Sequence, residues 1–145
     1  MKVSRAFFLA VAVALAAAGC DTADPTTTTT APSTIVQPTV ENFTGTVAVG
    51  GSDFKPFPVL LSGGTLTVTL TAAGPPSSIT MVLGVGTVSG SSCVLLSGGS
   101  LVTQAATTPQ LSGQVNAGAY CVQVADTGTG TQTGPVTYAV TVTHY

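Results

Sequence analysis

The sequence predicts an all-β fold, a single antiparallel β-sandwich or jelly-roll-like domain. The first observation is a strict alternation of apolar and polar residues in several short segments, which is the pattern of a half-buried strand. The second is that clusters of Gly, Pro, Ser and Asn separate these segments. The third is composition: the 145 residues are 44% apolar and include 17 glycines, too hydrophobic for general disorder and too rich in Gly for a helical bundle.

Six segments are predicted to be strands. The clearest is TLTVTLT at residues 65–71, in which Leu66, Val68 and Leu70 share one face and four threonines occupy the other. The remaining five lie at residues 43–49, 57–61, 79–85, 119–125 and 136–142. Because turn signals rather than helical segments connect them, we expect two packed antiparallel sheets and no βαβ unit.

The motif VLLSGG occurs twice, at residues 59–64 and 94–99. The similarity ends soon after on both sides of the two copies. We therefore predict two strand-turn-strand hairpins with Gly-Gly turns at these places. An internal duplication is the alternative.

Residues 1–19 are predicted to be an export signal peptide. Lys2 and Arg5 give a positive start, and an uninterrupted apolar stretch follows at residues 6–18. A membrane-spanning helix is the alternative, but a span needs about 20 apolar residues and this stretch is shorter. An export signal is therefore the preferred interpretation.

The residues around the end of this signal, Ala17, Ala18, Gly19 and Cys20, resemble the lipobox of bacterial lipoproteins. The resemblance implies that Cys20 becomes the new N-terminus and carries lipid, because its thiol is the nucleophile that can accept a diacylglycerol. Several acyl chains together anchor a protein stably in a bilayer. The alternative is ordinary secretion, with Cys20 as a free thiol or in an intermolecular bridge.

Residues 20–40 are predicted to comprise the lipidated cysteine and a disordered linker rich in Thr and Pro. Prolines at positions 25, 32 and 38 are too closely spaced for a helix or a strand. Residues 41–145 then form the folded domain. We expect the protein to lie on the exported face of a bacterial cell envelope, in the periplasm or at the cell surface.

If Cys20 carries lipid, Cys93 and Cys121 remain as a pair in an oxidising compartment, and we expect them to form a disulfide. Two buried free thiols are the alternative. Val122 and Val124 share one face of their predicted strand, which places Cys121 on the opposite face. The bridge is therefore expected to join the Cys93 region to the strand of Cys121 across a sheet surface.

Composition argues against several function classes. Charged residues make up 6% of the chain and Lys55 is the only basic residue after Arg5, so no surface for nucleic acid is expected. The single histidine, His144, is next to the last residue, which is a poor place to hold a catalytic base. One histidine without clustered carboxylates also leaves a catalytic metal short of ligands. The sequence predicts a protein that is not an enzyme and needs no cofactor.

Four stretches, FTGTVAVGGSDFKPFPV, GGTLTVTLT, NAGAYCVQVADTG and GPVTYAVTV, resemble the bacterial pre-peptidase C-terminal domain over most of residues 41–145. The strongest pieces are the Gly-x-Tyr-x-Val-x-Val strand that begins at Gly118 and the final strand at residues 138–142. The resemblance implies a small β-sandwich that accompanies exported enzymes. We expect a non-catalytic envelope lipoprotein that presents this sandwich to an envelope protein or polysaccharide. The alternative is a polysaccharide- or protein-substrate-binding module that assists exported hydrolases.

Some members of that family bind calcium through acidic residues near the start of the domain. The resemblance makes Glu41, Asn42 and Asp53 weak calcium candidates here. The family often carries a D-x-D-x-aromatic stretch, in which Asp53 and Phe57 match but Lys55 replaces the second acid. Since calcium takes six to eight oxygen ligands, no bound metal is expected.

Overall fold

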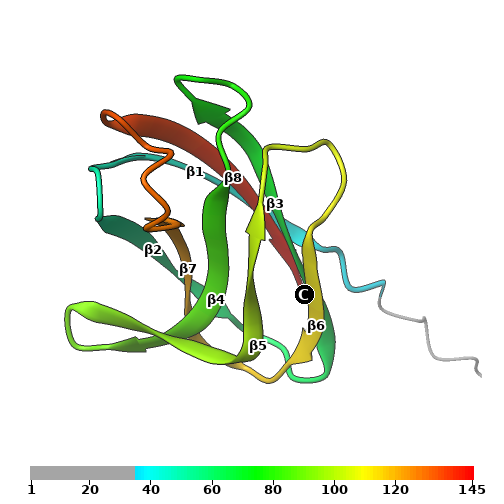
Figure 1. The fold of residues 1–145 in the computed structure, drawn as a ribbon. Helices are drawn as coiled ribbons and strands as arrows, with labels where there is room; N and C mark the ends of the chain where they lie inside the picture. The colour runs from blue at the N-terminus through cyan, green and yellow to red at the C-terminus, as the bar shows by residue number, and fades with distance from the viewer. Residues whose placement is uncertain (1–34) are drawn as a thin grey trace, which may run out of the picture. The chain divides into compact units, whose positions relative to one another are not determined.

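Eight strands form two four-stranded antiparallel sheets in the computed structural model, which describes residues 35–145 (Figure 1). The strands are β1 (Thr39–Val47), β2 (Ser52–Val59), β3 (Gly64–Gly74), β4 (Met81–Ser89), β5 (Ser92–Thr103), β6 (Leu111–Val115), β7 (Gly118–Asp126) and β8 (Val136–His144). One sheet has the order β1-β8-β3-β6 and the other β2-β7-β4-β5. This order is that of a jelly roll, so the predicted all-β sandwich is confirmed.

The predicted signal peptide at residues 1–19, Cys20 and the linker as far as residue 34 lie outside the described residues. The described part of the linker, residues 35–38, contains no strand, and β1 begins at Thr39. Within residues 35–145 there is no helix long and apolar enough to cross a membrane. The described residues contain both sheets and the hydrophobic core between them.

The core consists of the inward-facing residues of alternating strands. In β3, Leu66, Val68 and Leu70 are buried, as the alternation in the sequence predicts. In β8, Val136, Tyr138, Val140 and Val142 are buried, and the residues between them are more exposed. β-branched residues are frequent in both strands, because their stiff side chains pack well on a pleated surface.

The two VLLSGG copies are not hairpins, and the prediction at these places is wrong. The first copy joins β2 to β3, which belong to different sheets, so the chain crosses the sandwich there. The second lies within the single strand β5, where Leu95 pairs with Gly86 and Ser100 pairs with Gly84. Residues 96–99 therefore form a large bulge. A Gly-Gly pair permits a turn or a bulge equally well, and local sequence does not decide between them.

The predicted disulfide is present and joins Cys93 in β5 to Cys121 in β7. The intervening strand β4 passes under the bridge at Gly86, where an added Cβ would lie 2.9 Å from the Cys93 sulfur. Gly86 pairs with Cys121, on the face of the sheet opposite to the core residue Val122. The bridge therefore crosses the outer surface of the sheet, as expected. Cys121 is nevertheless fully buried.

Candidate binding site between two free sheet edges

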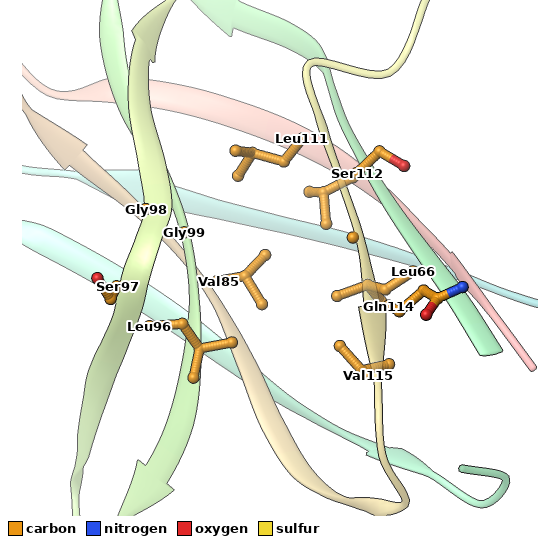
Figure 2. Close-up of a pocket in the computed structure, with 12 residues that line it drawn as sticks. Leu66, Val85, Leu96, Ser97, Gly98, Gly99, Leu111, Ser112, Gln114 and Val115 are labelled. Atoms are coloured by element: carbon orange, nitrogen blue, oxygen red, sulfur yellow. The ribbon is translucent and has the colours of Figure 1, made fainter. Parts of the chain in front are cut away.

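A pocket of about 220 Å³ opens between β5 and β6. These two strands are edge strands of different sheets and lie on the same side of the sandwich (Figure 1). The pocket is the space where the two sheets separate, with β3 and β4 behind it. Figure 2 shows Val85 of β4 and Leu111 of β6 directed into this space from opposite sides.

The wall of the pocket is predominantly apolar. Six apolar side chains contribute to it: Leu66, Val68, Val85, Leu96, Leu111 and Val115. Ser112 and Gln114 also lie at the pocket, but they alternate along β6 with the inward-facing Leu111 and Val115, so their side chains point outward. An apolar pocket of this kind favours the burial of an apolar group.

Two local features keep the pocket open. Gly113 pairs with Leu66 and occupies an inward position of β6, yet it has no side chain to place there. A Cβ added at Gly113 would meet no heavy atom within 4 Å, so the space beside it is empty. The second feature is the bulge of β5, in which Gly98 has a φ of 71° and Gly99 packs against the backbone of Val85. Together they leave the space between the edges of the two sheets without a side chain from these positions.

The pocket lies in a part of the protein without charge. Between Lys55 and Asp126 the sequence contains no charged residue and no histidine, and this region includes β3, β4, β5 and β6. A charged ligand would lose its hydration in the pocket and find no opposite charge there. The arrangement therefore suits a neutral group.

Two charged side chains of β2, Asp53 and Lys55, form an ion pair beside Tyr138 of β8. The Lys55 ammonium lies 3.1 Å from Asp53 Oδ2, and the Tyr138 hydroxyl donates a hydrogen bond of 2.8 Å to the same carboxylate oxygen. Gly45 leaves room for this contact, since a side chain there would collide with the Tyr138 ring. Burial raises the pKa of Tyr138 above its usual value of 10.0, and the hydrogen bond and the negative charge of Asp53 raise it further. Tyr138 is thus a neutral donor that fixes Asp53.

His144 is held more firmly than its place near the chain end suggests. It pairs with Thr39 in the ladder between β1 and β8, its ring lies 5.6 Å from that of Phe57, and it is buried. The Nε2 atom lies 3.0 Å from Glu41 Oε1. Among residues 35–145, no three or more His, Cys, Asp and Glu side chains are placed to hold a metal ion.

The three calcium candidates are not brought together. Glu41 and Asn42 are neighbours on β1, so their side chains lie on opposite faces of the sheet. Glu41 contacts His144, and Asn42 accepts a hydrogen bond of 2.8 Å from the Thr141 hydroxyl. Asp53 is engaged by Lys55 and Tyr138. Each candidate has its own polar contact within the domain.

The sequence predicts no binding residue, and the pocket between β5 and β6 is not evident from it. Its lining comes from four strands, of which β5 lacks the alternation that identifies strands and β6 is short, with a glycine at its middle inward position. One signal was present: LSGQV carries Gly at the inward position between Leu111 and Val115. The inward position of this glycine can be recognised only when β6 is known to be a strand.

No protein-family model matches the chain, and no curated protein matches it in sequence. Among solved structures, the chain is similar to Aeromonas hydrophila PliG, described as a periplasmic lysozyme inhibitor of g-type lysozyme. The match has a TM-score of 0.46 and 17% identity, and it covers 73% of this chain and 86% of that chain. At this distance the similarity carries no argument about function. No family model supports the resemblance to the pre-peptidase C-terminal domain, which stays a prediction from the strand motifs.

Proposed function

We propose that the protein is a non-catalytic lipoprotein of the bacterial cell envelope whose sandwich binds a neutral, apolar group of a partner in the pocket between β5 and β6. In this proposal, residues 1–19 are the signal peptide, Cys20 carries the lipid, residues 20–40 include the linker and residues 41–145 form the binding domain. The domain would then act as an accessory module, the role that the likeness to pre-peptidase C-terminal domains implies.

One observation carries the binding proposal: an open apolar pocket of about 220 Å³ lies in the charge-free part of the sandwich. For comparison, an engineered apolar cavity of about 150 Å³ binds benzene. The pocket is therefore large enough for one aliphatic or aromatic group. No aromatic side chain lines it, whereas sugar-binding sites usually stack sugar rings on aromatic residues. This favours a protein partner over a polysaccharide.

The location is supported by the Cys93–Cys121 disulfide, since such bonds persist in oxidising compartments outside the cytoplasm. An exported domain held near a membrane would meet its partner in that compartment. The uncharged half of the sandwich is also free of groups that would attract a charged polymer.

The binding proposal can be tested with small neutral probes. ¹⁵N-labelled residues 35–145, which contain both sheets, the core and the disulfide, would be titrated with cyclohexanol and, separately, with cyclohexanecarboxylate. We expect cyclohexanol to shift the amide resonances of Val85, Leu111 and Val115, and the carboxylate to shift them much less. Equal binding of both probes, or no shifts at the pocket, would refute the proposal.

A pair of glycine substitutions provides the matched control. Gly113→Leu places a side chain in the pocket, and it should abolish the shifts caused by cyclohexanol. Gly134→Leu adds the same side chain in the connection between β7 and β8, where an added Cβ also meets no heavy atom within 4 Å. This second variant should bind cyclohexanol as the wild type does.

A further inference from the structure

The sheet β2-β7-β4-β5 has two edges, and only one of them carries prolines and inward-pointing charges. The edge strand β2 carries Pro56 and Pro58, which have no N–H to donate. It also carries Asp53 and Lys55, whose ladder partners are the buried Val124 and Val122, so both charged side chains point inward. Prolines and inward-pointing charges are features by which proteins prevent edge-to-edge pairing.

The opposite edge strand, β5, has none of these features. It is 12 residues long and contains no proline and no charged residue. The bulge at residues 96–99 is its one irregularity. Several of its apolar side chains are exposed: Val94, Leu95, Leu96 and Val102. A long, uncharged edge with exposed apolar residues is a surface that readily accepts a further strand.

We propose that β5 is the docking edge for an extended, uncharged peptide segment of a partner protein, and that one apolar side chain of this segment enters the pocket between β5 and β6. The inference rests on the proposed function and names the class of partner. The unpaired N–H and C=O groups along an edge strand form a row that an extended polypeptide backbone matches.

The position of the pocket links the two parts of this interaction. Residues 96–99 of β5 form one wall of the pocket, so a strand paired with β5 would pass along its opening (Figure 2). Because successive side chains of a strand point to opposite faces, alternate residues of the peptide would face the space between the sheets. The backbone pairing would then supply affinity, and the pocket would select the side chain.

The distribution of charge specifies the chemistry of the peptide. No charged residue lies on β3, β4, β5 or β6, so an acidic or basic peptide would find no partner for its charges there. A leucine, isoleucine, methionine or phenylalanine side chain would bury its apolar surface against Val85, Leu111 and Val115. We therefore expect an uncharged segment with one large apolar residue.

The test is selection from a phage-displayed library of random 12-residue peptides on immobilised residues 35–145. We expect the selected peptides to share an uncharged segment with one large apolar residue. Binding of a selected synthetic peptide should slow hydrogen exchange of the β5 amides. Failure to enrich any sequence, enrichment of charged motifs, or protection of a different strand would overturn the proposal.

Two variants and two controls locate the binding. Val102→Lys places a charge on the exposed edge, and Gly113→Leu fills the pocket. Each should weaken binding of the selected peptide about tenfold or more, the effect expected for a central anchoring contact. Val49→Lys changes a similarly exposed valine outside β5, and Gly134→Leu adds a leucine away from the pocket. Both controls should bind like the wild type, and hydrogen exchange of β3 and β8 would report whether each variant is folded.

The outcomes separate this inference from the proposed function. If cyclohexanol binds in the pocket but no peptide binds at β5, the peptide proposal alone is wrong. If neither binds, both proposals are wrong. If the β5 amides become protected as the concentration of the protein alone is raised, the strand pairs with a second copy, and this result also overturns the peptide proposal.

Discussion

Gly113 lies directly opposite Leu66 in the ladder between β6 and β3, and the missing side chain at Gly113 leaves a space at the edge of an otherwise packed core. Inward positions of a sandwich normally carry side chains that fill the space between the sheets. At this place the sheets instead enclose the pocket of about 220 Å³. The empty space opposite Leu66 therefore bears both on the stability of the domain and on its proposed binding site.

Filling the pocket should stabilise the domain while removing the binding site. Gly113→Leu buries an additional apolar side chain and replaces a glycine in a strand. We expect the free energy of unfolding to rise by about 1–2 kcal/mol, measured by urea denaturation. Gly134→Leu, in which the added side chain meets no pocket, should change the free energy of unfolding by less than about 0.5 kcal/mol. A loss of stability in Gly113→Leu would show that the space is not available to a side chain.

Removal of the disulfide should weaken the domain considerably. Cys93 and Cys121 are 28 residues apart in sequence, and losing a cross-link that closes a loop of this length costs about 3.5 kcal/mol in the chain-entropy account. The double variant Cys93→Ala/Cys121→Ala should therefore unfold at lower urea concentration than the wild type. Adding a reductant should destabilise the wild type by a similar amount and leave the double variant unchanged. Equal stability of the two proteins without reductant would contradict this account.

The sequence predicts the strands in the middle of the sheets well and the pocket edge poorly, for a physical reason. β3 and β8 have neighbours on both sides and one buried face, so alternation such as that of Leu66, Val68 and Leu70 is imposed on them. β5 lies at an edge, bulges at residues 96–99 and exposes apolar residues, so its alternation is lost. The pocket depends on which two edges meet in the fold. That information is not local in the sequence.

The contact between Tyr138 and Asp53 predicts a loss of stability in alkaline solution. The pKa of Tyr138 is raised in the folded state, so the unfolded chain releases this proton at lower pH than the folded one. The free energy of unfolding should thus be unaffected by this group at neutral pH. It should fall above about pH 10, by up to about 1.4 kcal/mol per pH unit.

Tyr138→Phe is the variant that tests this pH dependence. It removes the titrating group, so the fall above pH 10 should become shallower by about 1.4 kcal/mol per pH unit. At pH 7 the same variant should be destabilised by about 1 kcal/mol, because Asp53 loses a hydrogen-bond donor. Denaturation midpoints measured between pH 7 and pH 11 would check both effects. An unchanged slope in Tyr138→Phe would show that this tyrosine does not cause the alkaline loss.

If Cys20 carries the lipid anchor, substitution of this one residue should release the protein from the membrane. Cys20→Ala removes the thiol that would accept lipid, so the protein should move from the membrane fraction to the soluble fraction. Labelling cells with a radioactive fatty acid should mark the wild type and not the variant. Cys93→Ala/Cys121→Ala keeps Cys20 and should remain in the membrane fraction. Retention of Cys20→Ala in the membrane would refute the anchor.

The central claim is that the space beside Gly113 holds a neutral apolar group, and intermolecular nuclear Overhauser effects test it most directly. They would be recorded between cyclohexanol and the methyl groups of ¹³C-labelled residues 35–145. We predict contacts to the methyl groups of Val85, Leu111 and Val115, and their loss in Gly113→Leu. Contacts to other parts of the surface, or contacts that persist unchanged in Gly113→Leu, would contradict the claim.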